Sequence, residues 1–402
     1  MSANPAAPRL FPLPDETPHV PPADPDFRKT TGIFPSQEIT ALIADGEIAS
    51  LVPIAPDQIQ PSSLDLRLGP RAYRVQASFL PGANATVMER VADLDGLPAI
   101  DLSQDTVFEK GAVYVVELLE SLRLTSGIEA AANPKSSTGR LDVLTRLITD
   151  RGTAFDKVER GYRGPLYLEV APLSFSVVVR QGTRLNQMRF FRGRPELPAT
   201  EVARLYTDGQ LSHAPFGVLL PLRGNLVPVS VDLGIDDRKI IGFKAKKSTK
   251  KIDYDRIGHY NPAEFWEPIY SDAGKLSLDR DDFYILATCE EIGVPPHLAA
   301  EMVPYDSSAG EFRVHYAGFF DPGFGWDGKA GGSKAVLEVR SYGVSFTLEH
   351  GQIVGWLSYS DIGTGTPDKV YGRGIKSNYQ GQGLALAKQF QPWPKPRGAG
   401  RR

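Results

Sequence analysis

A repeat of domain length constrains the fold of this 402-residue chain more than any other feature. Four landmarks recur in the same order, each separated from its counterpart by 167 to 171 residues. They are the extended segments 61–69 and 228–234, the serine pairs 136–137 and 307–308, the apolar segments around Glu169 and Glu338, and the segments that follow Gly182 and Gly351. A period this long is typical of duplicated whole domains rather than of solenoid units. The sequence therefore predicts two homologous domains in one chain.

Composition changes along the chain predict four segments. Residues 1–30 contain many prolines, which disfavour helix interiors and central strands, so we predict an arm that is either disordered or wrapped around a neighbouring subunit. Residues 31–205 form the first copy and 206–370 the second, with the boundary inside a linker rich in Pro and Gly at 196–225. Residues 371–402 form a Gly-rich tail that we expect to be mobile and to stay outside any core.

Apolar residues alternate with a period of two through both copies, as at 113–117 and 175–179. Gly and Pro interrupt these runs at short intervals. The pattern predicts an all-β fold, a barrel or a sandwich, with a few short helices. We expect one amphipathic helix at 35–48, with Ser36 as a possible cap, and another at 295–302, with proline in its first turn.

Charge and cysteine content exclude several classes of partner and site. A net charge of −3 gives no general attraction to nucleic acid polymers. The single cysteine, Cys289, excludes an internal disulfide and a multi-thiolate zinc site within one chain, and it fits a reducing, cytoplasmic compartment. We find no apolar run of the length that a membrane helix needs, no signal peptide, and no zinc-deaminase, P-loop or serine-hydrolase motif in a supporting context.

Two serines, a glycine and an arginine lie within the five residues 136–140. The hydroxyls and backbone N–H groups of such a turn can bind an oxyanion, and Arg140 offers a two-pronged guanidinium. An ordinary polar turn is the alternative, because short polar loops are common.

Glu169 and Glu338 each interrupt an apolar segment at the same position of the repeat. Strand alternation places each carboxylate on the face opposite its apolar neighbours. A desolvated carboxylate can shuttle protons, whereas a solvated strand face is the alternative for either residue taken singly. Recurrence at one repeat position favours the functional interpretation.

A tight turn at 321–323 joins two aromatic segments of the second copy. Aromatic side chains around such a turn can form the wall of a base-sized pocket, and a packed β-turn is the alternative. The first copy has Glu159 and Arg160 in place of the aspartate and proline, while Tyr162 keeps an aromatic residue.

Together, SSTGR, HYAGFFDPGFGW, AVLEV and HGQIVGWLSY resemble the dCTP deaminase branch of the dUTPase superfamily. The segment at 37–69 is similar to that family's first helix and strand, and the tail from Tyr371 is similar to its C-terminal lid. The resemblance covers nearly the whole chain after residue 30 and implies two dUTPase-like distorted β-barrels in tandem. Family members typically carry one copy and form trimers with active sites between subunits, so the resemblance implies a homo-oligomer, with a trimer favoured.

The resemblance also assigns roles to individual residues. It implies phosphate contacts from Lys135, Ser136, Ser137 and Arg140, a deoxyribose contact from Asp321, triphosphate contacts from Tyr371 and Gln382, and a catalytic role for Glu169 and Glu338. Three departures stand out: Glu311 replaces the arginine after the second serine pair, the first copy lacks the Asp-Pro-Gly turn, and Asn378 stands where the family usually has a lysine, with Lys376 nearby. Neither copy has a full set, so we predict a composite site in which Glu338 is the favoured base.

The activity implied by the resemblance is deamination of dCTP to dUTP and ammonia, in pyrimidine deoxynucleotide biosynthesis, with a glutamate as proton shuttle and without zinc. No cofactor is needed for this reaction, and Mg²⁺ is expected to accompany the triphosphate. Two alternatives stay open: a dUTPase or a bifunctional enzyme that yields dUMP, and a non-catalytic nucleotide-binding regulator.

Overall fold

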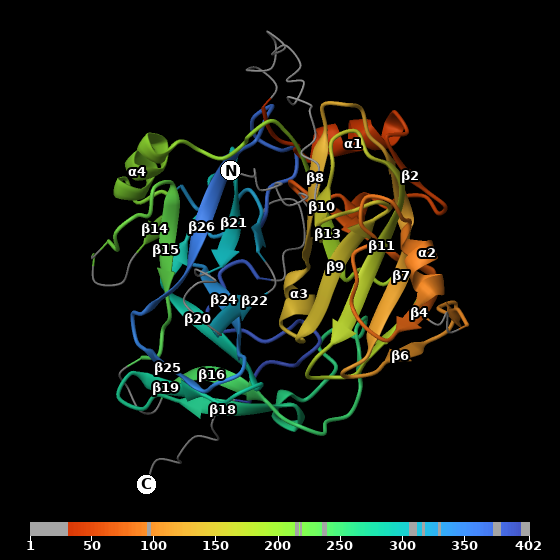
Figure 1. Ribbon diagram of the computed structural model, residues 1–402. Coiled ribbons are helices and arrows are strands. Elements are labelled where there is room, and N and C mark those ends of the chain that lie inside the picture. The colour runs from red at the N-terminus through yellow and green to blue at the C-terminus, as the bar shows by residue number, and fades with distance from the viewer. Residues whose placement is uncertain are drawn as a thin grey trace, which may run out of the picture.

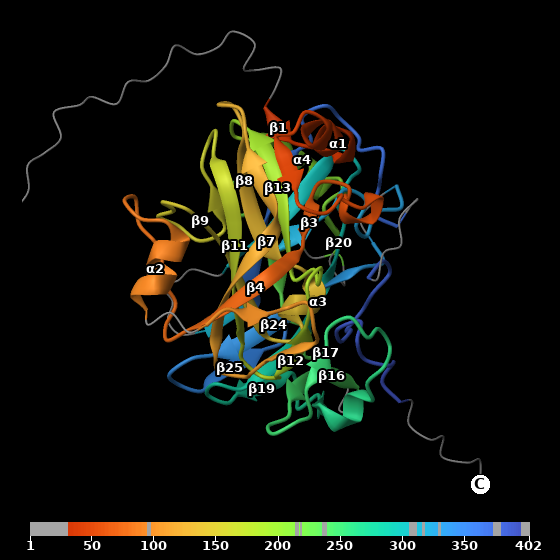
Figure 2. The same cartoon turned by 90° about the vertical axis from the view of Figure 1, so that its right-hand side faces the viewer.

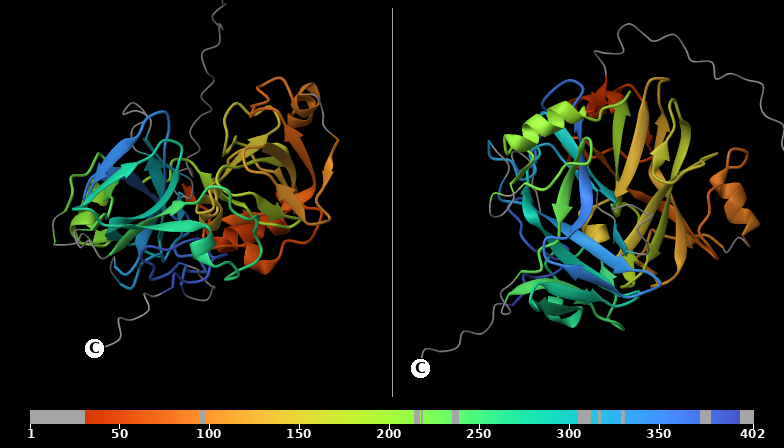
Figure 3. Two further views of the ribbon diagram at one scale, coloured as in Figure 1. Left: turned by 90° about the horizontal axis from the view of Figure 1, so that it is seen from below. Right: turned by 60° about the vertical axis from the view of Figure 1, so that its left-hand side comes forward.

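The computed structural model describes residues 31–94, 98–213, 217, 219–234, 239–304, 312–315, 318–328, 331–372 and 379–394. Two strand-rich halves lie side by side, the N-terminal half in orange to yellow and the C-terminal half in green to blue (Figures 1 and 3). Strands dominate and helices are short, which confirms the predicted all-β class. The predicted arm at 1–30 lies outside the described residues.

The larger sheet has the same strand order in both halves. In the first half the order is β5 (Ile100–Asp101), β4 (Leu68–Val75), β7 (Val113–Arg123), β11 (Arg163–Pro172) and β9 (Val143–Thr149), with β2 (Ile48–Ser50) also beside β7. In the second half it is β18 (Trp266–Tyr270), β16 (Ile240–Ala245), β20 (Phe283–Ile292), β24 (Lys334–Ser341) and β22 (Phe312–His315), with β14 (Ser212–His213) also beside β20. The strands pair antiparallel throughout.

The second sheet also has matching strands in the two halves. The first half contains β1 (Gly32–Ile33), β13 (Asn186–Arg192), β8 (Glu129–Pro134) and β10 (Lys157–Val158) in that order, with β3 (Leu64–Leu66) also beside β13. The second half contains β15 (Leu226–Ser230), β26 (Ile353–Asp361), β21 (Leu298–Pro304) and β23 (Phe319–Phe320). The repeated segments 61–69 and 228–234 contribute β3 and β15, which therefore occupy matching places beside β13 and β26.

Each half also contains one short strand pair, and the pair in the first half extends into the second half. In the first half β6 (Thr106–Phe108) pairs with β12 (Val177–Val179), and in the second half β19 (Lys275–Leu278) pairs with β25 (Phe346–Glu349). Strand β12 also pairs in parallel with β17 (Ile252–Asp253), so one small sheet contains strands from both halves.

The first predicted helix is confirmed as α1 (Ser36–Ala44), which buries Ile39 and Leu42, although Pro35 rather than Ser36 occupies its N-cap. Sequence analysis missed α4 (Ala199–Thr207), which precedes β14 as α1 precedes β2. The predicted boundary between residues 205 and 206 falls inside α4, so the copies divide more naturally before this helix. The other helices in the described part of the chain are α2 (Val87–Asp93), at the outer edge of the first half (Figure 2), α3 (Ser136–Gly139) and the 3₁₀ turns Pro56–Gln58 and Pro262–Glu264.

The predicted helix at 295–302 was wrong, because most of this segment belongs to strand β21. Its N-terminal residues Leu298, Ala299 and Ala300 are almost completely buried, and β21 pairs with β26 on one side and β23 on the other. The helix preference of alanine is a weak effect that pairing and burial routinely override.

The main hydrophobic core crosses the boundary between the halves. It combines the first-half barrel residues with Trp266, Phe283 and Val336 from the second half and Phe390 from the tail. Removing this shared apolar surface from water holds the halves together in one body.

A buried ion pair also links the halves. Arg340 on β24 donates to the Asp142 carboxylate, which also accepts from the Ser174 hydroxyl. Asp142 is fully buried, and burial raises its pKa to about 6 although the charge of Arg340 opposes the shift. The pair lies two residues beyond both Arg140 and Glu338, so it fixes the two segments that carry these side chains.

Replacing Arg340 tests this link. Arg340→Met leaves the Asp142 carboxylate buried without its cation, and we expect the free energy of unfolding, measured in urea, to fall by about 3–5 kcal/mol. Arg280→Met removes a guanidinium that is mostly exposed and pairs with Asp281, so it should change stability by less than about 0.5 kcal/mol. Equal losses in both variants would contradict a special role for the buried pair.

Candidate functional site

A cavity of about 220 Å³ lies between the two halves. Every residue to which sequence analysis gave a binding role lines it, and so does one of the two glutamates. These residues are Lys135, Ser136, Ser137 and Arg140 from the first half, and Asp321, Glu338, Tyr371 and Gln382 from the second half and tail. The structure thus brings the two incomplete motif sets into one composite site, while the second serine pair and Glu311 lie outside the described residues.

The serine turn forms the first-half wall of the cavity. It folds as α3, one short turn that directly follows strand β8, and it lies between the two halves in Figure 1. Arg140 follows this turn and is 3% exposed. Its Nη2 donates to Gln382 Oε1 at 2.9 Å and its Nη1 to the Ala385 carbonyl at 3.2 Å, so the guanidinium holds the tail against the first half.

Glu338 forms the opposite wall. It lies on β24 between Ile285 of β20 and His315 of β22, and it is 3% exposed. Its Oε1 lies 4.0 Å from Arg140 Nε. A carboxylate from one half therefore faces a buried guanidinium from the other.

Glu169 lies elsewhere, although it occupies the same repeat position. It is buried on β11 and is not among the residues that line the cavity. Its Oε1 accepts from Arg146 Nε at 2.9 Å, across the β11–β9 pair. The cross-strand partner of Glu338 at this position is His315, so the two copies differ at the residue beside the glutamate.

Asp321 is held by two first-half residues that sequence analysis did not single out. Ser62 Oγ donates to Asp321 Oδ1 at 2.8 Å, and Arg189 Nη2 lies 3.4 Å from the same oxygen. Arg189 also donates to the carbonyls of Ala300 and Phe320, and burial lowers its pKa. Ser62 lies in the repeated segment 61–69, so the repeat could have marked it as a site residue. Nothing in the sequence distinguishes Arg189.

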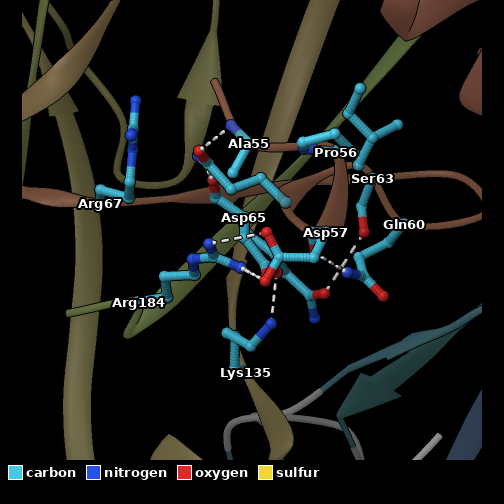
Figure 4. Close-up of polar contacts among 12 residues, drawn as sticks. Ala55, Pro56, Asp57, Gln60, Ser63, Asp65, Arg67, Lys135 and Arg184 are labelled. Atoms are coloured by element: carbon cyan, nitrogen blue, oxygen red, sulfur yellow. Dashed lines mark hydrogen bonds and ion pairs between the residues drawn. The ribbon is translucent and has the colours of Figure 1, made fainter. Parts of the chain in front are cut away.

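Lys135 and Asp65 line the cavity and belong to a wider network of charges. Lys135 forms an ion pair with Asp65 on β3, and Arg184 Nη1 lies 3.8 Å from the other Asp65 oxygen (Figure 4). Arg184 also donates to both oxygens of Asp57 at 3.0 and 3.1 Å, which lowers the pKa of that carboxyl. Gln187 and the tail residue Lys388 line the cavity as well, and sequence analysis missed all of these except Lys135.

The described tail is packed, which corrects the prediction that it stays outside the core. Ala387 and Phe390 belong to the main core, and Gln389 is completely buried. Tyr379, another missed residue, lies over the Arg140 guanidinium at 3.9 Å, and its hydroxyl hydrogen-bonds to Ser137 Oγ at 2.6 Å. The positions of Lys376 and Asn378 lie outside the described residues.

Outside the cavity, Asp232, Cys289 and His350 bring potential metal ligands within 4.8 Å of one another. Lys334 Nζ already donates to Asp232 Oδ2 at 2.7 Å, and the Leu233 N–H donates to His350 Nδ1 at 3.2 Å. The Lys334 ammonium beside Asp232 and the N–H that already occupies His350 Nδ1 both oppose cation binding, so the group is poorly suited to hold a metal.

Comparisons with known proteins agree across both halves. Residues 30–194 match the family model of the 2′-deoxycytidine 5′-triphosphate deaminase (DCD) N-terminal domain, and residues 203–390 match that of the C-terminal domain. A crystal structure of 2′-deoxycytidine 5′-triphosphate deaminase from Agrobacterium tumefaciens is 47% identical, with a TM-score of 0.77, and the match covers 84% of this chain and 100% of that one. Each of the two family models matches less than half of the chain. A structural match that covers 84% of the chain must therefore include both copies.

Two curated relatives match over a length close to one copy. The dCTP deaminase of Halorubrum lacusprofundi is 25% identical over 161 residues, which are 39% of this chain and 76% of that protein. The dUMP-forming dCTP deaminase of Bifidobacterium adolescentis is 29% identical over 163 residues, which are 40% of this chain and 79% of that protein.

Near Glu169 lies a second, partly buried carboxylate, that of Asp156. Its Oδ1 accepts from the Leu147 N–H at 2.8 Å. Burial is the main cause that raises its pKa to about 7, and the negative charge of Glu169 adds to the shift. Because the folded value exceeds the ordinary one of about 3.9, the folded state binds this proton more tightly than the unfolded chain does. The resulting stability is complete below about pH 4 and is lost as the pH rises to about 7.

Asp156→Asn removes this titration and keeps an oxygen that can accept from Leu147. We expect the wild type to lose about 2–3 kcal/mol of stability relative to this variant between pH 5 and about pH 7.5, measured by urea unfolding at each pH. The exposed Asp272→Asn is the control and should show no such difference. A parallel pH dependence of the wild type and Asp156→Asn would contradict the raised pKa.

Proposed function

The chain belongs to the 2′-deoxycytidine 5′-triphosphate deaminase family, and from this premise we propose that the cavity between its halves is the site at which it deaminates dCTP. Deamination of dCTP is the activity of this chain. The observation that carries the proposal for the site is the meeting of a buried carboxylate from one half, Glu338, with the serine turn, Lys135 and Arg140 from the other.

We assign the proton transfers to Glu338. Its carboxylate accepts a proton from water as the water oxygen bonds to C4 of cytosine, and it passes this proton to N3. It then takes the second proton from the new hydroxyl group on C4 and passes it to the amino group. Ammonia leaves as the C4 carbonyl forms, so dCTP and water give dUTP and ammonia, which makes the reaction a hydrolysis. Arg140, within 4.0 Å, balances the charge of the carboxylate between transfers.

The other lining residues orient the nucleotide. Asp321, held by Ser62 and Arg189, presents a carboxylate to the deoxyribose. Tyr371 packs against Phe324 with 5.7 Å between ring centroids, forming an apolar surface beside the Asp321 turn. The serine hydroxyls and Lys135 bind phosphate oxygens, and holding the phosphates fixes the distance between C4 and Glu338.

Mg²⁺ in this proposal enters with the triphosphate. Of the described residues that line the cavity, Asp65 is paired with Lys135 and Arg184, and Asp321 accepts from Ser62. Neither carboxylate is arranged to bind a cation directly, so the phosphate oxygens and water are the fitting ligands. None of the steps assigned to Glu338 depends on the ion.

Assembly and compartment remain predictions. We propose a homo-oligomer, with a trimer favoured, in the cytoplasm, as the family resemblance and the single cysteine indicate. Among the described residues, no helix has the length and apolar character needed to cross a membrane.

A bifunctional activity that yields dUMP is the second candidate, because several relatives are named dUMP-forming. Hydrolysis at the α-phosphorus needs a carboxylate that positions an in-line water. Asp65 lines the cavity, but its pairing with Lys135 and Arg184 makes it unsuited to that role, which favours dUTP as the product.

Incubation with dCTP distinguishes the candidates. We expect ammonia and dUTP in equal amounts and no pyrophosphate, measured by chromatography and an ammonia assay. Ammonia with pyrophosphate and dUMP would instead establish the bifunctional enzyme, and binding without turnover would establish the non-catalytic regulator.

Matched substitutions of the two glutamates test the assignment of the base. Glu338→Gln keeps the shape of the side chain but cannot accept the proton, so kcat for ammonia release should fall by about 10³-fold or more. Glu169→Gln should retain kcat within about threefold, because Glu169 lies outside the cavity, although loss of the negative charge that pairs with Arg146 should lower its stability. Circular dichroism at the assay temperature confirms that both are folded. Equal activity in the two variants would refute the assignment.

A further inference from the structure

Lys388 is a cationic residue of the cavity that the motif comparison did not assign. It comes from the tail, yet it lines the same cavity as Lys135, Ser136 and Ser137. Of the tail residues that the structure describes, it is the one that carries a positive charge. Gln382, the tail residue expected to contact phosphate, is instead hydrogen-bonded to Arg140 and to the Lys334 backbone.

The backbone of Lys388 is fixed. Its N–H donates to the Tyr379 hydroxyl at 3.2 Å, and its carbonyl accepts from the Gly258 N–H at 2.9 Å. The neighbouring Ala387 and Gln389 are buried. The tail therefore presents the Lys388 side chain from a rigid position rather than from a loose end.

The Lys388 ammonium lies near Lys135 and near carboxylates that are paired with other cations. No carboxylate of the described residues lies within ion-pairing distance of it, and the nearest influential acids, Asp65 and Asp255, are already bound by other cations. Burial and repulsion from Lys135 lower the pKa of Lys388. A partly buried ammonium without a counter-ion is unfavourable, and an anionic ligand that enters the cavity would remove this cost.

We propose that Lys388 and Lys135 together bind the outer phosphates of the nucleotide, so that this corner of the cavity selects triphosphates over monophosphates. The inference rests on the proposed function, because the bound anion is the polyphosphate of the substrate or product. Two ammonium groups beside two serine hydroxyls suit a polyanion of several charges better than a single carboxylate. Arg184 adds to the positive charge behind Asp65 (Figure 4).

Calorimetric binding of dUTP and dUMP tests the proposal without turnover. Lys388→Gln should weaken dUTP binding about tenfold, as the loss of one charged hydrogen bond implies, and leave dUMP binding within about twofold. Lys388→Arg, which keeps the charge, should recover most of the affinity. Lys250→Gln is the control, because it removes a lysine whose side chain is 82% exposed and pairs with Glu264.

Steady-state kinetics with dCTP give a second readout. Lys388→Gln should raise KM about tenfold with kcat within about twofold, since a contact to the outer phosphates does not change at the transition state. An equal loss of affinity for dUTP and dUMP, or no loss for either, would overturn the proposal.

The two proposals fail in different ways. If the wild type binds dUTP selectively through Lys388 but releases no ammonia from dCTP, the proposed function fails and the Lys388 assignment stands. If the wild type deaminates dCTP and Lys388→Gln binds dUTP as well as the wild type does, the Lys388 assignment alone fails. A wild type that binds neither nucleotide refutes both.

Discussion

The contact on which the site depends is the approach of Arg140 to Glu338 across the boundary between the halves. Arg140 also holds Gln382 and the Ala385 carbonyl of the tail, so three distant parts of the chain meet at one buried guanidinium. A buried cation is tolerated only where carboxylates, carbonyls or aromatic rings surround it, and here the carboxylate comes from β24 while the carbonyl and the ring come from the tail. Packing of the halves, position of the tail and geometry of the cavity are therefore coupled.

Duplication explains how one chain can form a composite site between its own halves. Two copies of the same topology provide two similar surfaces, and each copy can lose the part that the other supplies. The first copy keeps the serine turn and pairs its own glutamate, Glu169, with Arg146. The second copy keeps Glu338 and the Asp321 turn. Single residues show this divergence: the cross-strand partner of the glutamate is Arg146 in the first copy and His315 in the second.

Much of the fold was predictable because it follows local patterns. Alternating apolar residues predicted strands, and the pattern at 35–48 predicted α1. The segment at 295–302 failed because its alanines pack between two strands, a pairing that no local pattern records. Helix α4 lay inside a segment rich in Pro and Gly, and the tail residue Phe390 joins a core built from strands far away in sequence.

The sequence by itself determined the number of copies, the strand-rich class and eight of the residues that line the cavity, because these follow from repeated and recognisable motifs. The family resemblance favoured Glu338 over Glu169, and the tertiary structure showed the physical difference: both are buried, but only Glu338 lines the cavity. It alone placed Arg189 behind Asp321 and Lys388 beside Lys135. Contacts between residues more than a hundred positions apart are set by how two sheets pack, and a linear pattern carries no record of that packing.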